Sequence, residues 1–242
     1  FRVTTDLNGK LFGTGDTLKV ITHAGLHAGG PYASADAGVA VFVESAPFVP
    51  EEPWLRSFQF DVLGTSEHDT PESQTLFRTE GKLDDRGSLE SVFTLAESPV
   101  LYGRLTVEST VRDDRGKSVA GRVSALYFGR DRYVGILQPG WVLEAGQPAR
   151  AEILVLDQHG KAAAGTDVEV KVERQITRAS RVKGAGDIYL TQYVQEWAET
   201  ESFKLSSGKD PREITFTPSH PGSCRIRASI VDTLGRPHET VL

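Results

Sequence analysis

The chain has 242 residues, enough for one large domain or for two of about a hundred residues each. Its 38% hydrophobic and 25% charged residues are typical of an ordinary soluble protein. The formal net charge of -6 argues against a nucleic-acid-binding protein, which needs a clustered excess of Lys and Arg. No apolar run approaches the roughly 20 residues that a membrane-spanning helix requires.

The ends and the cysteine content give two further expectations. The sequence begins with Phe1 and contains no Met, so we expect a fragment, or a mature product without its leader. Cys224 is the only cysteine, which excludes a disulfide within the chain and a Cys-rich metal site.

Turn signals punctuate the whole sequence. The pattern Asp-x-x-Gly occurs at positions 6–9, 84–87, 113–116, 157–160 and 232–235, beside stretches of alternating apolar residues. Asp accepts hydrogen bonds from backbone amides two residues on, and Gly adopts the positive φ of a tight turn. Residues 114–123 and 157–168 share a longer version: a turn, Gly-Lys, small residues, a second Gly and a strand. The pattern predicts antiparallel hairpins in two related β domains.

Alternating apolar and polar residues predict about seven strands in each half of the chain. In chain order, the first half has them at 17–22, 38–43, 56–62, 74–80, 88–95, 101–111 and 119–128. The second half has them at 133–137, 149–156, 168–174, 188–196, 201–205, 213–216 and 224–231.

The strand pattern predicts an all-β fold. Clean alternation, as at 168–172 and 224–230, is typical of strands with one wet face, whereas buried parallel sheets give continuous apolar runs. No segment of the sequence has convincing helical periodicity. We therefore predict two tandem antiparallel β-sandwiches of the immunoglobulin-like kind, with domains at 1–129 and 130–242 and a short joint around residue 130.

A proline-rich insertion at 44–55 interrupts the first half. It holds three prolines with aromatic neighbours. We interpret it as a Pro-braced loop that Phe48 and Trp54 hold to the sandwich. The alternative is a docking surface for a neighbouring domain.

A basic insertion at 175–187 interrupts the second half. Arg178, Arg181 and Lys183 lead into a Gly-Ala-Gly sequence between two predicted strands. We interpret it as a long solvated hairpin and name the three cations as a possible protease-sensitive loop.

No catalytic, cofactor-binding or metal-binding constellation is recognisable in the sequence. A zinc site needs three or four converging ligands, and the scattered histidines lack such spacing. The Gly-x-Ser-x-Gly of hydrolases is missing, and the Gly-rich segments match no phosphate-binding loop. Cys224 alternates with Ile226 and Ala228, so we expect a small buried side chain. The histidines are His23, His27, His68, His159, His220 and His238.

Several segments of the second half resemble one domain of the bacterial alpha-2-macroglobulins. These are residues 130–136, 144–149, 156–161, 168–174 and 216–223, and the similarity continues through 228–237. The first half is similar to the preceding domain of that family, with a modified hairpin at 23–41 and a closing segment at 122–127. The resemblance covers essentially the whole chain and implies two consecutive macroglobulin-like β-sandwiches.

The resemblance also implies a function, carried by a larger protein. Such proteins trap attacking proteases after cleavage of a bait region, so this segment would be structural and not an enzyme. Its partners would be neighbouring macroglobulin domains of the same chain and, through the full-length protein, target proteases. The location implied is the periplasm, with an inner-membrane lipid anchor outside this segment. The Cys-Gly-Glu-Gln thioester of many members is absent, and Cys224 does not stand in that motif.

An immunoglobulin-like binding, adhesion or accessory module of a cell-surface protein is the alternative, because sandwiches host many functions. Carbohydrate binding would favour an exposed aromatic platform. Trp54, Trp141 and Trp197 are far apart and each adjoins a strand, so we expect them in core or edge packing.

Overall fold

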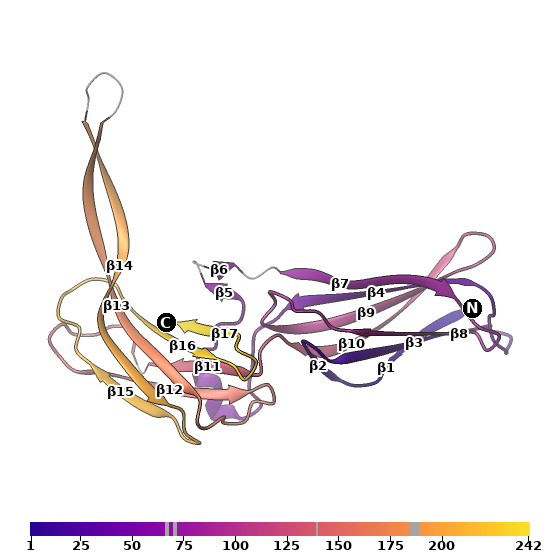
Figure 1. The fold of residues 1–242 in the computed structure, drawn as a ribbon, viewed down its shortest axis with the longest axis horizontal. Helices are drawn as coiled ribbons and strands as arrows, with labels where there is room; N and C mark the ends of the chain where they lie inside the picture. Colours follow the sequence, from indigo (N-terminus) through magenta and orange to yellow (C-terminus); the bar gives the residue numbers. More distant parts are fainter. Residues whose placement is uncertain (66–67, 70–71, 139, 184–188) are drawn as a thin grey trace. The chain divides into compact units, whose positions relative to one another are not determined.

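The computed structural model describes residues 1–65, 68–69, 72–138, 140–183 and 189–242, and no side chains within 64–71 or 182–190. The chain divides into two compact units (Figure 1). Unit 1 comprises Phe1–Phe48 and Val62–Asp131, and unit 2 comprises Val49–Asp61 and Arg132–Leu242. None of the helical structure among these residues has the length and apolarity to cross a membrane.

Unit 1 contains two main β-sheets. One has the strand order β1-β3-β8 and the other β2-β10-β9-β4-β7, and β5 and β6 form a separate pair. The strands are β1 (Arg2–Leu7), β2 (Leu11–Gly13), β3 (Thr17–Gly25), β4 (Asp36–Ser45), β5 (Gly64–Thr65), β6 (His68–Asp69), β7 (Ser73–Lys82), β8 (Ser88–Thr94), β9 (Tyr102–Arg112) and β10 (Ser118–Phe128).

The core of unit 1 lies between its two sheets. Leu18 and Val20 of β3 are fully buried in the same cluster as Val41 of β4 and Val107 of β9. A buried polar contact joins the sheets inside this core: the Thr22 hydroxyl donates to the Ser109 hydroxyl oxygen at 2.7 Å. Each of these strands buries every second residue, as the alternation in the sequence requires.

Unit 2 also contains two sheets, with strand orders β11-β12-β15 and β14-β13-β16-β17. The strands are β11 (Arg132–Leu137), β12 (Ala149–Asp157), β13 (Asp167–Lys183), β14 (Tyr189–Ser206), β15 (Arg212–Phe216), β16 (Cys224–Val231) and β17 (Pro237–Val241). Its core joins Ile136 and Ile153 of one sheet to Val170 and Ile226 of the other.

The all-β sandwich fold predicted from the sequence is therefore confirmed. One detail differs from a purely antiparallel arrangement. Among the described residues every strand pairing is antiparallel except that of β2 with β10, which is parallel.

Four of the five Asp-x-x-Gly turns share one geometry. Gly87, Gly116, Gly160 and Gly235 have φ between 71° and 81°, and each donates its N–H to the backbone carbonyl of the Asp three residues before. The Asp carboxylate also accepts from the amides two and four residues on, as Asp157 does from His159 and Lys161. The fifth copy differs, because Gly9 does not have a positive φ. The sequence signal thus predicts these four turns correctly, but only two of them close hairpins: 113–116 joins β9 to β10 and 232–235 joins β16 to β17. The turns at 84–87 and 157–160 connect strands of different sheets.

The proline-rich insertion differs from its interpretation as a loop held by Phe48 and Trp54. Phe48 is buried in unit 1 beside Tyr102, but residues 49–61 belong to unit 2 and include the short 3-10 helix η1 (Pro53–Ser57). The backbone of Gln59 pairs with Ile136 through two hydrogen bonds of 2.8 and 3.0 Å. Residues 49–61 therefore cover the edge of β11, although the division of the sequence assigns them to the first domain. As independently folding domains, 1–129 and 130–242 stay a prediction.

Candidate functional site

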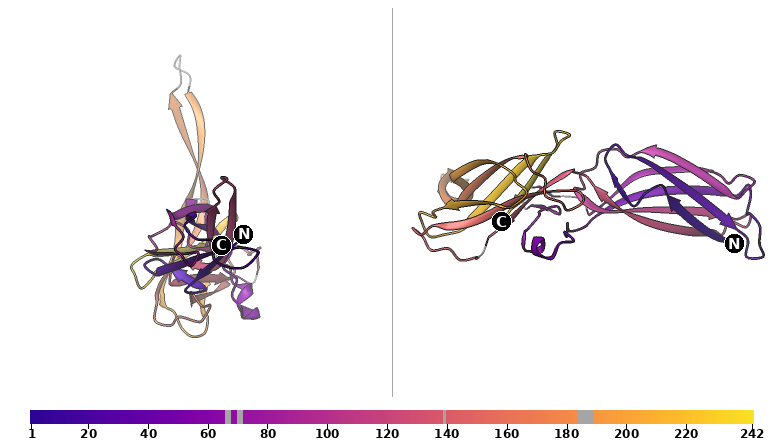
Figure 2. Two further views of the ribbon diagram at one scale, coloured as in Figure 1. Left: turned by 90° about the vertical axis from the view of Figure 1, so that its right-hand side faces the viewer. Right: turned by 90° about the horizontal axis from the view of Figure 1, so that it is seen from below.

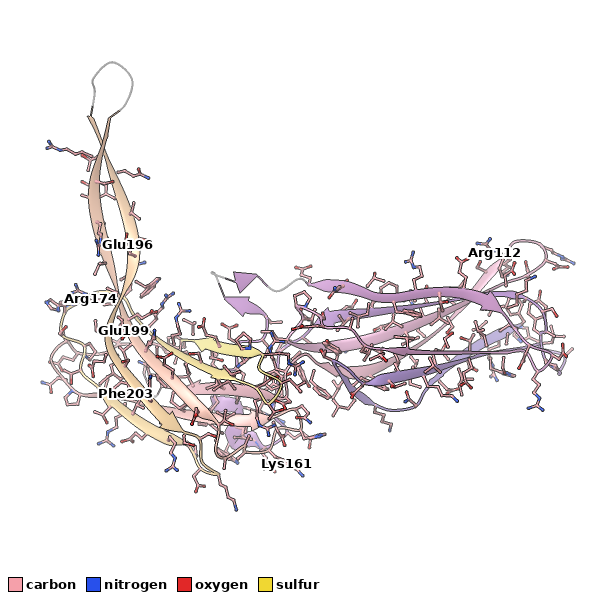
Figure 3. All side chains as sticks on the ribbon, viewed as in Figure 1. Arg112, Lys161, Arg174, Glu196, Glu199 and Phe203 are labelled. Atoms are coloured by element: carbon pink, nitrogen blue, oxygen red, sulfur yellow. The ribbon has the colours of Figure 1, made fainter. Side chains whose placement is uncertain are left out.

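The long hairpin of β13 and β14 is the most distinctive feature of unit 2. The two strands pair along their whole length, from Asp167 with Ser206 to Lys183 with Tyr189. The part nearer residue 167 is packed in the sandwich, whereas the far part stands clear of the sheet that it leaves (Figures 1 and 2). Figure 3 labels Phe203, Glu199, Arg174 and Glu196 in order along this hairpin.

A β-bulge marks the point where the hairpin leaves the sandwich. The register shifts between Val172, which pairs with Glu201, and Glu173, which pairs with Glu199. The extra residue, Thr200, donates its hydroxyl hydrogen to the Val172 carbonyl at 3.0 Å. Bulges bend a strand and increase its twist, so this one redirects the hairpin away from the sheet.

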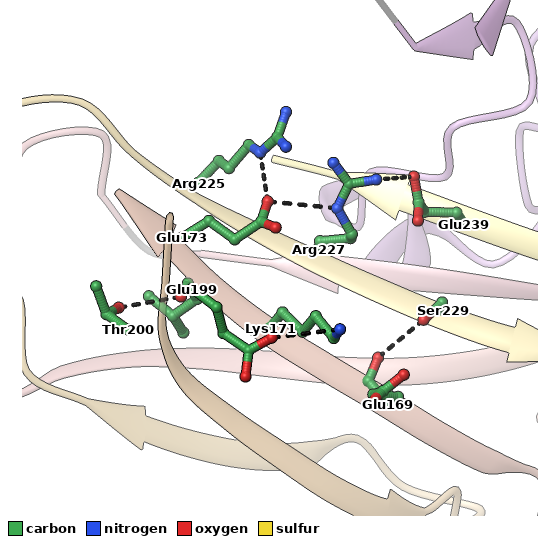
Figure 4. A network of polar contacts seen from close by, with 10 residues as sticks. Glu169, Lys171, Glu173, Glu199, Thr200, Arg225, Arg227, Ser229 and Glu239 are labelled. Atoms are coloured by element: carbon green, nitrogen blue, oxygen red, sulfur yellow. Dashed lines mark hydrogen bonds and ion pairs between the residues drawn. The ribbon is translucent and has the colours of Figure 1, made fainter. Parts of the chain in front are cut away.

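A network of ion pairs lies beside the bulge (Figure 4). The Glu173 carboxylate accepts from Arg225 Nε at 2.5 Å and from Arg227 Nε at 3.3 Å. Arg227 Nη1 donates in turn to Glu239 at 2.5 Å. The side chains of Glu173, Arg225 and Arg227 are only 10–14% exposed, so water screens their attraction weakly. The network ties β13, β16 and β17 together.

Trp197 of β14 extends this network. The Arg225 guanidinium lies over its ring, 4.2 Å from the centroid, in a cation–π contact. Lys171 and Glu199 add an ion pair of 3.3 Å between β13 and β14. The hydrogen bond to Glu199 is the main cause that raises the pKa of Lys171. Side-chain contacts therefore fix the base of the hairpin: β13 is joined to β14 and to β16, and β14 is joined to β16 through Trp197.

The three cations predicted as a protease-sensitive loop all lie on β13. Arg178 is exposed and forms an ion pair of 2.9 Å with Glu196, across the strand pair. Arg181 is exposed, and Lys183 is the last residue of the strand, with its side chain outside the described residues. The interpretation of a long hairpin is confirmed, but residues 175–183 are strand and not loop. Their sensitivity to proteases stays a prediction.

Cys224 lies at the boundary of the unit 2 core. Its side chain is half-buried against the core cluster and lines a cavity of about 580 Å³ with Trp141, His220 and Phe216. Burial, and then the charge of Glu201, raise the pKa of the thiol. The thiolate is the reactive form of cysteine, so this environment makes Cys224 less reactive. The sequence predicts a buried Cys224 side chain, and the structure shows one that is only half-buried.

Two of the three tryptophans differ from the expected core or edge packing. Trp141 is 87% exposed and its neighbour Val142 is 92% exposed. Trp54 is 53% exposed, and its ring makes a T-shaped contact with the ring of Phe58. Trp197 alone follows the expectation, since it is half-buried on Arg225.

The residues around His238 form a second polar cluster, where residues 49–61 meet β11 and β17. His238 is buried, and its Nδ1 accepts from the Val134 amide at 3.1 Å while Nε2 contacts the Asp61 carbonyl oxygen at 3.1 Å. Burial, and then the charge of Glu239, raise the pKa of Asp61 to about 6. In the part of the chain that the structure describes, no group of three or more His, Cys, Asp or Glu side chains could hold a metal ion.

Known proteins similar to this chain are found by sequence as well as by structure. No family model matches the sequence. An alpha-2-macroglobulin homolog of Nostoc sp. (strain PCC 7120 / SAG 25.82 / UTEX 2576) is 22% identical over 236 residues, which are 96% of this chain and 12% of that protein. The chain therefore spans about an eighth of the length of this relative.

Solved bacterial alpha-2-macroglobulins share the fold. The native E. coli protein superposes with a TM-score of 0.58 and 15% identity over 100% of this chain and 16% of its own. The Salmonella protein reacted with methylamine gives 0.59 and 14%, over 99% of this chain and 16% of its own. The resemblance seen in the sequence is confirmed: the chain is similar in sequence to a curated alpha-2-macroglobulin homolog and shares its fold with solved bacterial alpha-2-macroglobulins, over a segment of their length.

Proposed function

We propose that this chain is a structural segment of a protease-trapping inhibitor of the alpha-2-macroglobulin type, and has no catalytic activity of its own. The observation that carries the proposal is the similarity to bacterial alpha-2-macroglobulins along 96–100% of the chain, in both units. The E. coli relative has been solved after activation by porcine elastase and by trypsin, so proteases act on that protein.

The close packing of the two units is consistent with a structural role in a larger protein. Each has a close-packed core between two sheets, and such cores transmit displacement instead of absorbing it. A trap that rearranges after one cleavage needs rigid modules that move as whole bodies and exchange the contacts between them. In this proposal the partners are other macroglobulin domains of the same protein and, through them, the target protease.

We also propose a periplasmic location with an inner-membrane lipid anchor outside residues 1–242. This part of the proposal rests on the resemblance alone. Fractionation of cells that express the full-length protein tests it: the protein should remain with the inner membrane, facing the periplasm.

The main test uses the full-length protein that contains this chain and porcine elastase. After incubation, elastase should lose most of its activity on a large protein substrate but retain activity on a small chromogenic peptide, because a trapped protease excludes only large substrates. Residues 1–242 alone should leave both activities unchanged. Equal loss of both activities, or inhibition by the segment alone, would contradict the proposal.

One observation favours the alternative of an immunoglobulin-like binding module. Trp141, at 87% exposure, borders the cavity that Cys224 lines, and exposed aromatic rings are common in carbohydrate sites. A glycan array with residues 1–242 and the Trp141→Ala variant tests this function. A ligand that depends on Trp141 would favour the alternative over the structural role.

A further inference from the structure

The far part of the β13–β14 hairpin is a two-stranded ribbon with an open edge. Inside the sandwich β13 pairs with β14 on one side and β16 on the other, but its pairing with β16 ends at Arg174 and Cys224. From Gln175 to Arg181, the only strand that pairs with β13 among the described residues is β14. We call the side of Gln175–Arg181 that faces away from β14 the open edge.

The backbone groups on the open edge can be assigned from one hydrogen bond. The Gln175 N–H donates to the Ser223 carbonyl at 2.9 Å, on the side where β16 lies. Successive residues of a strand direct their N–H and C=O groups to opposite edges. Thr177, Ala179 and Arg181 therefore present these groups to the open edge, where they form a template for a further strand.

A two-stranded ribbon is a weak structure by itself. Isolated hairpins are marginally stable in water, and a third strand gives each backbone group of the middle strand a partner. The side chains of the ribbon are also poorly covered, with Tyr193 70% exposed and Val194 39% exposed. An added strand on β13 would give these backbone groups partners and would lie beside the exposed side chains of residues 177–181.

Charge distinguishes the two strands of the ribbon. Residues 175–183 of β13 contain Arg178, Arg181 and Lys183 and no acidic residue, whereas residues 189–197 of β14 contain Glu196 and no basic one. Glu196 already pairs with Arg178, and Arg181 has no ion pair with any other described residue. The open edge is therefore basic, on a chain whose net charge is -6.

We propose that the open edge of β13 binds an extended, acidic segment of a second polypeptide as an added β-strand. The acidic strand of this chain that would suit the position, β14, already occupies the opposite side of β13. The backbone supplies the hydrogen bonds of the pairing, and Arg181 selects carboxylates on the added strand.

The test measures fluorescence anisotropy of labelled (Thr-Glu)5 and (Thr-Lys)5 peptides with residues 1–242 at low salt. The acidic peptide should bind saturably and more tightly. Bulk electrostatics would give the reverse order, because the protein is acidic. Arg181→Glu should weaken the acidic peptide by about tenfold, whereas Arg104→Glu, an equal charge change at an exposed site in unit 1, should not.

Proline variants test which edge is used. Ala179→Pro removes an N–H from the open edge without removing one from the β14 pairing, and should weaken the acidic peptide by about tenfold. Gln195→Pro is the matched control, because the Gln195 N–H points to the outer side of β14. Circular dichroism checks that both variants fold.

Four results would overturn the proposal. They are no saturable binding, tighter binding of the lysine peptide, loss of binding with Gln195→Pro but not with Ala179→Pro, and a concentration-dependent dimer that excludes the peptide. The last would assign the open edge to a second copy of this chain.

Discussion

The Phe60 ring lies directly against Gly135, so that a Cβ placed at residue 135 would be 2.5 Å from a ring carbon. Gly135 is in the middle of β11, next to Ile136, which pairs with Gln59. The missing side chain at 135 therefore makes room for the segment that covers this edge of unit 2.

Gly135→Ala should loosen residues 49–61 from β11. The added methyl group must displace the ring or the strand, and overpacking of this kind costs about 1–3 kcal/mol. Chemical denaturation should show this loss in the free energy of unfolding. The double variant Gly135→Ala/Phe60→Leu should recover part of it, since the smaller side chain leaves room for the methyl group. An unchanged stability of Gly135→Ala would show that Phe60 does not pack there.

Asp61 should make unit 2 less stable as the pH rises from about 4 to about 6. Its pKa is about 6 in the folded protein and 3.8 ordinarily, so in this window the folded state binds more protons than the unfolded state. Stability from this group is complete below pH 3.8 and is lost as the pH passes 6.

Asp61→Asn tests this dependence. The variant keeps the backbone bonds of residue 61 to Thr240 and His238 but cannot ionise. Relative to the parent protein it should gain stability between pH 4 and pH 7, by about 1 kcal/mol because the carboxyl is partly exposed. Urea denaturation at several pH values measures the difference. A difference that is constant with pH would show that Asp61 ionises normally.

Strands with one solvent-exposed face were predictable from the sequence, and so was a long hairpin in the second half, but the strand at residues 175–183 was not. β16 directs Ile226 and Ala228 into the core and Arg225 and Arg227 to the opposite face, where the ion-pair network covers them, and its predicted range matches the structure. In contrast, residues 177–181 are all exposed, so alternation gives no signal there. The pairing to β14 extends the strand regardless, as cross-strand contacts replace burial.

Residues 56–62 show the opposite error. Phe58 and Val62 are buried and alternate with polar residues, which predicts a strand. The structure has the end of η1 and a single bridge at Gln59, and the chain passes from unit 2 to unit 1 between Asp61 and Val62. β1 and β17 were missed for another reason: their buried positions include Thr5, His238 and Thr240, which are polar.

The sequence named the cations of the hairpin but could not name their partners. Glu173 lies 52 residues from Arg225, and their contact depends on the register of β13 with β16. Arg178 meets Glu196 only through the register of β13 with β14. Registers of this kind follow from packing across the whole sheet.

Glu173→Ala should destabilise unit 2 by about 3 kcal/mol. It removes the carboxylate that balances the positive charges of Arg225 and Arg227 in a nearly buried site. Glu213→Ala is the control: Glu213 pairs with Arg150 at 3.5 Å, but both side chains are at least half exposed. Its cost should be at most about 1 kcal/mol. Thermal or chemical denaturation measures both variants, and equal costs would contradict the role assigned to the network.

Cys224 should react slowly with a thiol reagent in the folded protein. Burial, and then the charge of Glu201, raise its pKa, so a smaller fraction of the thiol is ionised than in the unfolded chain at the same pH, and its half-buried position limits access. The rate with iodoacetamide should be at least about tenfold lower in buffer than in denaturant at the same pH. Glu201→Gln should increase the rate in buffer, because it removes a charge that disfavours the thiolate. A folded rate equal to the denatured one would show that the thiol is freely accessible.

Trypsin should make its first cuts in residues 1–242 within the ribbon, after Arg178, Arg181 or Lys183. A protease needs local opening of the strand pair, and a two-stranded ribbon opens at lower free energy than a strand inside a sandwich. Mass spectrometry of early digests identifies the sites. The Arg178→Gln/Arg181→Gln variant should slow these cuts, whereas Arg227→Gln, within the sandwich, should not. First cuts inside β4, β9, β12 or β16 would show instead that a sandwich opens before the ribbon does.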